Sequence, residues 1–266
     1  KQLFHFSHTT SRAVLKAFLL EVRMLSVIRH PNCVAFFGCC IEAGRHSIVT
    51  EYVAGGSLFD WLAPYRTDVG VAAETAHKGP SKPAPPVQKR IAWLLEAASA
   101  LQYLHSKSIV HRDIKSLNVL VDGDSLGAQV KICDFGLAVA RSRDRIVTGS
   151  AHDFTLQWAA PELLMGQPYT PACDIYSFGV LAYELFALRI PYDFAVTVRL
   201  YYEVGVAGLR LQMPPVDPPQ ADPRQLAAAA HPTALDALVT QCFADAASRP
   251  TFQNLCDQLR AMLILE

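Results

Sequence analysis

Two short polar runs, separated by an apolar stretch, carry the residues best suited to chemistry. The first reads His-Arg-Asp-Ile-Lys-Ser-Leu-Asn over residues 111–118, and the second reads Asp-Phe-Gly over residues 134–136. Their functional side chains are the carboxylates of Asp113 and Asp134, the ammonium of Lys115 and the amide of Asn118. We expect these four groups to share one site, because the first run places three of them side by side.

These side chains suit the transfer of a phosphoryl group to a hydroxyl. Such a transfer needs little covalent work from a protein, so positioning and charge neutralisation dominate. Asp113 is expected to accept the proton of the hydroxyl, for which it must be ionised and within hydrogen-bond reach. Lys115 would place positive charge at the transferred group. Asn118 and Asp134 offer hard oxygen donors, which suit Mg²⁺.

The order and separation of the two motifs resemble those of the eukaryotic protein kinases, and the resemblance runs along the whole chain. It implies an α+β, bilobal fold with a small β-rich lobe and a large, mainly helical lobe. We expect residues 1–266 to form one domain, with 1–53 as a partial N-lobe and 54–266 as the C-lobe. The resemblance also implies ATP and Mg²⁺ as cofactors and a protein as substrate.

In this family Asp113, Lys115 and Asn118 would be catalytic, and Asn118 and Asp134 would hold the metal. Near the start of the sequence, Lys1 would contact the ATP phosphates and pair with Glu21. The family's glycine-rich phosphate loop is not in the sequence, so we expect the domain to lack its first two strands. The sequence leaves open whether this is truncation or true absence, and so whether the chain as given is active.

The resemblance also places an adenine pocket. Residues 34–37 and 47–53 are rich in β-branched and aromatic residues, which predicts two strands. The implied adenine-site residues are the gatekeeper Thr50, the hinge residues Glu51 and Val53, and the apolar floor Leu120. Because Thr50 is small, we expect a back pocket that admits bulky inhibitors.

Apolar periodicity predicts the helices that must position these residues. The predicted helices cover residues 11–28, 58–62, 87–106, 195–206, 234–243 and 252–264. The resemblance implies one more helix, which starts at Asp174 and is buried on all sides over 178–188. A hairpin is predicted over 119–121 and 129–132. Residues 64–86 are rich in Pro, Gly, Ala, Lys and Thr, which favours a disordered insertion, and 214–232 is expected to be a loop.

Residues 137–155 resemble an activation segment. Thr148 and Ser150 are the expected phosphorylation sites, and the guanidinium of Arg112 would bind the phosphate. This implies an upstream kinase. Thr155 begins a run that matches the family's Thr-x-x-Trp-x-Ala-Pro-Glu, although Phe154 stands where a glycine is usual.

Thr155 would hydrogen-bond near Asp113 and Lys115. A lysine two residues after the catalytic aspartate, together with this threonine, is the serine/threonine-kinase pattern, and other phrases resemble the tyrosine-kinase-like group, which includes dual-specificity enzymes. The resemblance also implies three supports: Glu162 paired with Arg249, Asp174 holding the catalytic-loop backbone, and stacked core residues at His111, Phe135, Leu25 and Phe36.

The bulk composition excludes several function classes. The 24 basic and 24 acidic residues balance, which gives no support for nucleic-acid binding. Apolar runs are too short to predict a membrane segment. The seven cysteines form no C-x-x-C pair or regular framework, which favours reduced thiols and a cytoplasmic location.

Two other functions compete with a kinase that signals by phosphorylating proteins. A pseudokinase-like or scaffold module is favoured only by the missing glycine-rich loop, because the catalytic residues show no decay. A small-molecule phosphotransferase of the same fold is disfavoured by the complete activation segment with its Ala-Pro-Glu ending.

Overall fold

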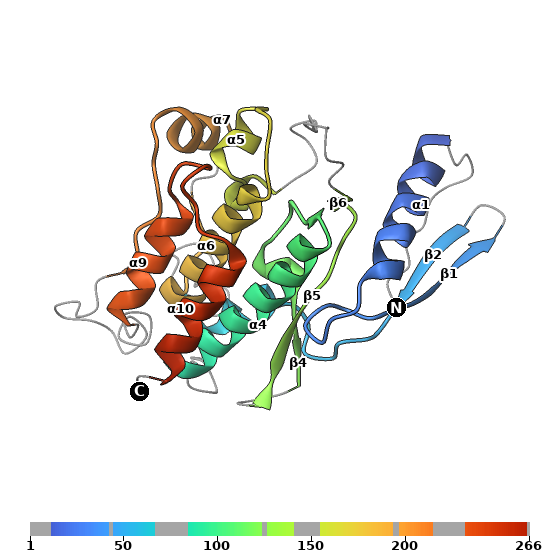
Figure 1. Ribbon diagram of the computed structural model, residues 1–266, viewed down its shortest axis with the longest axis horizontal. Coiled ribbons are helices and arrows are strands. Elements are labelled where there is room, and N and C mark those ends of the chain that lie inside the picture. The colour runs from blue at the N-terminus through green and yellow to red at the C-terminus, as the bar shows by residue number, and fades with distance from the viewer. Residues whose placement is uncertain are drawn as a thin grey trace.

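The computed structural model describes residues 12–42, 45–66, 85–123, 127–140, 155–193, 197–214 and 232–264. Helix α1 and strands β1 and β2 lie at one end of the molecule, and most helices lie at the other, with the β4–β5 pair between (Figure 1). The predicted α+β, bilobal arrangement is therefore confirmed. Lys1, Thr148, Ser150 and Phe154 lie outside the described residues.

The helices match the apolar periodicity closely. The α-helices are α1 (Arg12–Val27), α2 (Leu58–Leu62), α4 (Val87–Ser106), α5 (Pro161–Leu164), α6 (Ala172–Ala187), α7 (Thr197–Leu200), α9 (Thr233–Cys242) and α10 (Phe252–Ile264). Short 3-10 turns are η1 (Ala63–Tyr65), η2 (Ser116–Asn118) and η4 (Leu156–Trp158), and η5 (Tyr201–Val206) is a π-helix. Among the described residues, no helix is long and apolar enough to cross a membrane.

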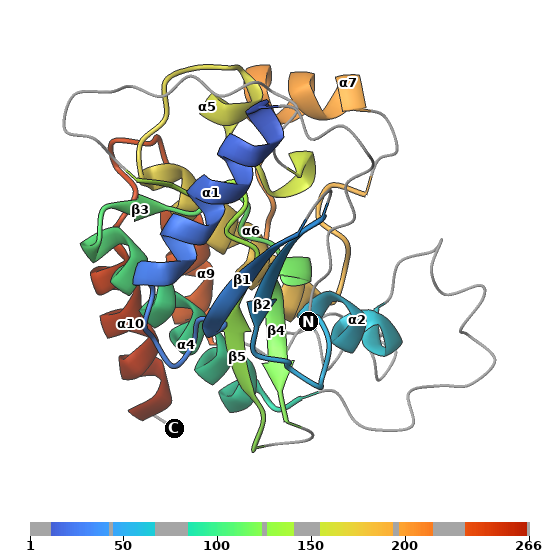
Figure 2. The ribbon, with the colours of Figure 1, turned by 90° about the vertical axis from the view of Figure 1, so that its right-hand side faces the viewer.

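The described strands form three antiparallel pairs. They are β1 (Phe36–Glu42) with β2 (Arg45–Thr50), β3 (Ile109–Val110) with β6 (Val139–Ala140), and β4 (Val119–Asp122) with β5 (Gln129–Ile132). The predicted hairpin is β4–β5, where Leu120 lies opposite Lys131. In Figure 2 this pair lies below β1 and β2 and beside α4. The β4–β5 pair therefore lies where the strand-containing end of the molecule meets the helical end.

Helix α6 is the core of the helical region. Fourteen of its residues are buried, including residues on every side of the helix, as a helix without an amphipathic pattern should be. Its predicted start at Asp174 is two residues late. Helix α4 is buried along Ile91, Leu94, Ala98 and Leu101 and ends just before β3. The two helices together fix the direction in which the chain enters residues 111–118.

Four predicted boundaries were wrong. The strand predicted over 34–37 begins at Phe36 and runs to Glu42, because β1 keeps pairing with β2 although its outer residues are exposed and show no alternation. The strand predicted over 47–53 ends at Thr50. The helix predicted over 195–206 is a four-residue α-helix followed by a π-helix.

The fourth correction concerns the predicted insertion at 64–86. Tyr65 ends a 3-10 turn, and both it and Arg66 are buried. Pro85 and Pro86 are also described and lead into α4. The rest of the predicted insertion, residues 67–84, lies outside the described residues. Residues 215–231 of the predicted loop also lie outside them.

Gly55 allows the chain after β2 to lie directly against β4. Its N–H donates to the carbonyl of Val121 at 3.1 Å, and the Val121 N–H donates to the carbonyl of Gly56 at 2.9 Å. A Cβ added at Gly55 would overlap that carbonyl oxygen. Ser57 then caps α2 by accepting from the Asp60 N–H at 3.1 Å.

Replacing Gly55 with alanine is expected to destabilise the fold by about 1–3 kcal/mol, because backbone and not a flexible side chain would have to move. The displacement would also separate the residues after β2 from Leu120, the implied floor of the adenine site, so any nucleotide binding there should weaken. Urea unfolding and nucleotide titration measure the two effects. Gly127→Ala is the matched control, since a Cβ there meets nothing within 4 Å. Equal unfolding free energies for the two variants would contradict this account.

Candidate active site

Asp113 is the centre of the polar cluster that the first motif builds. It is buried, with 7% of its surface exposed. Its Oδ2 accepts from Lys115 Nζ at 2.5 Å and from Asn118 Nδ2 at 2.9 Å. Its Oδ1 accepts from the Thr155 N–H at 3.2 Å. Four residues that the sequence analysis singled out therefore meet at one carboxylate.

Lys115 connects the first motif to the segment that begins at Thr155. Its Nζ lies 2.6 Å from Thr155 Oγ1 as well as 2.5 Å from Asp113 Oδ2. The predicted contact between Thr155 and this pair is confirmed. Because one ammonium bridges a carboxylate and a hydroxyl, the two segments hold a fixed relative position beside Asp113.

The backbone around Asp113 is held by Asp174, at the start of α6. Its carboxylate accepts from the N–H groups of His111 at 2.9 Å and Arg112 at 2.8 Å, as predicted. It also contacts His105 Nε2 at 2.8 Å. Burial alone would raise the pKa of Asp174, but the hydrogen bonds and positive charge around it hold that pKa below its usual value. The carboxylate therefore stays ionised and anchors the loop.

The second motif places its two side chains in different surroundings. Phe135 is buried and packs against the His111 ring at 5.2 Å between centroids, as the predicted stack requires. Asp134 is exposed and has a positive φ of 60°. Arg112, in the first motif, also has a positive φ, of 69°. Non-glycine residues seldom adopt this backbone region, and they often do so at functional sites.

Glu21 reaches the same region from α1. A Cβ added at Gly136 would lie 3.3 Å from Asp134 Oδ1 and 3.8 Å from Glu21 Oε2, so both carboxylates flank this glycine. Burial, and then the negative charge of Asp134, raise the pKa of Glu21 to about 6. Two neighbouring carboxylates favour a positively charged partner. The pairing of Glu21 with Lys1 stays a prediction, because Lys1 is not described.

A cavity of about 290 Å³ lies between α1, the β1–β2 pair and β4. It brings together all of the described residues predicted to bind ATP. Its lining includes Glu21, Thr50, Glu51, Val53, Leu120, Asn118 and Asp134. Asn118 also contacts Asp113, so the cavity opens beside the polar cluster.

The donors at this cavity fit Mg²⁺ bound together with a phosphate-bearing ligand. The Asn118 amide nitrogen faces Asp113, which leaves the amide oxygen for a metal. The carboxylate of Asp134 is exposed at the cavity. Within the described part of the chain, no group of three or more His, Cys, Asp or Glu could hold a metal alone. Mg²⁺ commonly takes one or two carboxylates and completes its shell with phosphates and water.

Comparison with known proteins assigns the family. The chain matches the family model described as protein tyrosine and serine/threonine kinase over residues 4–259. The chain belongs to this kinase family. It is similar to a probable serine/threonine-protein kinase of Dictyostelium discoideum, with 35% identity over 92% of this chain and 23% of that protein.

Two plant kinases are similarly related. Identity to the serine/threonine-protein kinase CTR1 of Arabidopsis thaliana is 32% over 92% of this chain and 26% of that protein. Identity to the serine/threonine-protein kinase STY17 of the same plant is 29% over 94% of this chain and 38% of that protein. The chain spans less than two fifths of the length of each of these relatives.

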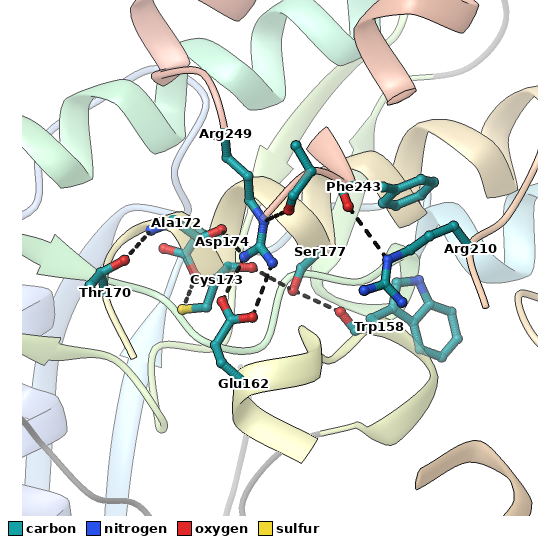
Figure 3. A network of polar contacts seen from close by, with 11 residues as sticks. Trp158, Glu162, Thr170, Ala172, Cys173, Asp174, Ser177, Arg210, Phe243 and Arg249 are labelled. Atoms are coloured by element: carbon teal, nitrogen blue, oxygen red, sulfur yellow. Dashed lines mark hydrogen bonds and ion pairs between the residues drawn. The ribbon is translucent and has the colours of Figure 1, made fainter. Parts of the chain in front are cut away.

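A second ion pair of the kinase domain lies in its helical region. Arg249 donates to both oxygens of Glu162, at 2.6 and 3.0 Å, and to the carbonyls of Ala172 and Ala244 (Figure 3). This pairing was predicted. It joins α5, the first turn of α6 and the chain after α9, so it supports the position of the segment that carries Thr155.

Sequence reasoning missed Cys133, which lines the kinase cavity, and Lys131, which pairs with a residue that lines it. Cys133 precedes Asp134, and burial raises the pKa of its thiol to about 12 and makes it a poor nucleophile. Lys131 pairs with the Glu51 carboxylate at 3.1 Å. The opposite charges were visible in the sequence, but nothing local linked two residues 80 positions apart.

Proposed function

We propose that this domain transfers the γ-phosphoryl group of ATP to serine or threonine hydroxyls of protein substrates. The observation that carries the proposal is the position of Asp113, whose carboxylate is bound by Lys115, Asn118 and the Thr155 backbone beside the cavity. A hydroxyl brought to this carboxylate meets a proton acceptor and an ammonium together. That combination is what phosphoryl transfer to an alcohol requires.

In the proposed reaction Asp113 accepts the proton of the attacking hydroxyl. Lys115 neutralises charge that develops on the transferred group, and Thr155 keeps the ammonium in place. When bound, Mg²⁺ would supply positive charge that neutralises the ATP phosphates. Asn118 and Asp134 would hold it through an amide and a carboxylate oxygen. The adenine would lie on Leu120 against the backbone of residues 51–53.

The experiment is a transfer assay with γ-³²P-ATP, Mg²⁺ and full-length protein. Matched peptides that differ only in Ser, Thr or Tyr at the acceptor position distinguish the candidates. We expect label on Ser and Thr peptides. Label on all three would indicate a dual-specificity kinase. Nucleotide binding with no transfer to any protein or peptide would instead indicate a pseudokinase-like module.

We also propose control by phosphorylation of Thr148 or Ser150, with Arg112 as the residue that binds the phosphate. Its Nε donates to the Leu137 carbonyl at 2.6 Å, and its Nη1 donates to Tyr169 at 3.1 Å. A phosphate could add a bidentate contact to the same guanidinium. We expect alanine at both positions to lower turnover several-fold, with mass spectrometry detecting a phosphate on one of them in the active protein. An unmodified active protein with a fully active double variant would disprove this.

Other assignments extend this proposal. Similarity to CTR1 and STY17 supports membership of the tyrosine-kinase-like group, and an upstream kinase acting on the activation segment is a further proposal. The absent glycine-rich loop, the division into N-lobe and C-lobe at residues 53 and 54, and the cytoplasmic location stay predictions.

A further inference from the structure

A buried carboxylate with no part in the proposed chemistry lies close to the active site. Glu184, in α6, has 0% of its surface exposed. Its Oε1 accepts from Arg66 Nη2 and from Ser116 Oγ, both at 2.7 Å, and its Oε2 accepts from Trp158 Nε1 at 3.1 Å. A buried carboxylate is costly unless it is paired in this way, so these contacts form a strongly specified unit.

Two of the three donors come from segments that the proposed chemistry uses. Ser116 lies in η2, directly after Lys115 and two residues before Asn118. Trp158 lies in η4, three residues after Thr155. Both are buried. Glu184 therefore ties the catalytic loop to the segment that contacts Lys115 and Asp113 from the other side.

Arg66 is the cationic member of this unit. It follows η1, and its guanidinium carbon lies 3.8 Å from the centre of the Phe59 ring, on α2. Its side chain is 2% exposed. An arginine held by a ring on one side and a carboxylate on the other has little freedom, so its position is coupled to that of Glu184.

Charge makes Arg66 more than a packing residue. Burial raises the pKa of Glu184 to about 7, and the nearby positive charge of Arg66 opposes a further rise. An ionised Glu184 carboxylate can accept from Ser116 at one oxygen and from Trp158 at the other. A protonated carboxyl carries a hydrogen on one oxygen, and that oxygen would act as a donor instead. Arg66 therefore favours the form of Glu184 that can hold both segments.

We propose that Arg66 is a positioning residue for phosphoryl transfer, which acts through Glu184 to hold Ser116 and Trp158 on either side of Asp113. This inference rests on the proposed kinase activity. Arg66 does not line the ATP cavity, so its loss should change the catalytic step and protein-substrate binding more than nucleotide binding.

The test compares Arg66→Met and Arg66→Lys with the wild type in full-length protein. Arg66→Met should lower turnover about 10- to 100-fold, since small misplacements of reacting groups have effects of this size. The dissociation constant for Mg²⁺·ATP should change less than about twofold. Arg66→Lys should recover part of the turnover, because it keeps the positive charge. Arg260→Met, at an exposed position on α10, is the matched control.

Two readouts separate positioning from a general loss of structure. The acidic limb of the pH–turnover profile should move to higher pH in Arg66→Met, by about one unit or more, because an opposite charge near Glu184 is lost. The indole ¹H–¹⁵N resonance of Trp158 should shift in the same variant, and this signal needs no enzymatic activity. Ser116→Ala, which removes one donor only, should give a smaller loss of turnover.

Failure of the role proposed for Arg66 can be told apart from failure of the proposed kinase activity. An inactive wild type that also shows no transfer to peptides would overturn the kinase proposal. An active wild type with unchanged turnover and pH profile in Arg66→Met would overturn the positioning role alone. Should Arg66→Met not fold, Arg66→Lys and Ser116→Ala decide the matter, and unchanged turnover in both would overturn it.

Discussion

Replacing Asp113 with asparagine is expected to lower turnover about 10²- to 10⁴-fold, the usual contribution of a positioned general base. The carboxylate is buried among three donors, namely Lys115 Nζ, Asn118 Nδ2 and the Thr155 N–H. An amide of the same shape can still accept at one oxygen, so the loop should keep its position. It cannot accept the proton of an attacking hydroxyl, and the chemical step should suffer.

The measurement is transfer from γ-³²P-ATP at saturating ATP and peptide, together with a nucleotide titration. The Mg²⁺·ATP dissociation constant of Asp113→Asn should stay within about twofold of the wild type, because Asp113 does not line the described cavity. Asp257→Asn, exposed on α10, is the matched control for the chemical change. An Asp113→Asn protein with more than a tenth of wild-type turnover would disprove the base role.

The second large effect concerns stability. Arg249→Met is expected to lower the free energy of unfolding by about 3–5 kcal/mol, because it leaves the Glu162 carboxylate without its cation in a largely buried place. The side chains of Arg249 and Glu162 are 2% and 11% exposed. The same guanidinium also donates to the carbonyls of Ala172 and Ala244, at 3.0 and 2.9 Å (Figure 3). One substitution therefore removes four contacts that join three segments.

Urea unfolding of Arg249→Met, Glu162→Gln and the double variant isolates the charge effect. The double variant should be more stable than the sum of the single losses predicts, because it removes the uncompensated carboxylate as well as the guanidinium. Arg260→Met should cost little, since its partner Asp257 is exposed. A loss below about 1 kcal/mol for Arg249→Met would contradict a structural role for the pair.

Much of the site could be predicted because its residues lie in short runs with fixed spacing. Asp113, Lys115 and Asn118 are within one loop, and Asp134 follows the hairpin β4–β5, so local order determines their proximity. Helix α4 was predicted with its observed bounds, Val87–Ser106, since its apolar stripe repeats over many turns. Periodicity works best for long elements that bury one face.

The parts that sequence reasoning missed depend on distant partners. Arg66 was assigned to a disordered insertion because its surroundings are rich in Pro and Gly. It is in fact buried and paired with the carboxylate of Glu184, 118 residues away. Glu184 interrupts an apolar run, which gave no sign that three donors would surround it. Strand β1 was misplaced because its exposed face lacks alternation, and only its pairing with β2 defines its length.

The most direct test of the site is the binding of Mn²⁺, as a paramagnetic substitute for Mg²⁺, with a non-hydrolysable ATP analogue. Electron paramagnetic resonance would follow binding to full-length protein. The account predicts that wild type and Asp113→Asn bind the metal–nucleotide pair alike, while Asn118→Ala weakens binding and Asp134→Asn abolishes it. Wild-type affinity in Asp134→Asn, with loss in Asp113→Asn instead, would contradict the assignment of these residues.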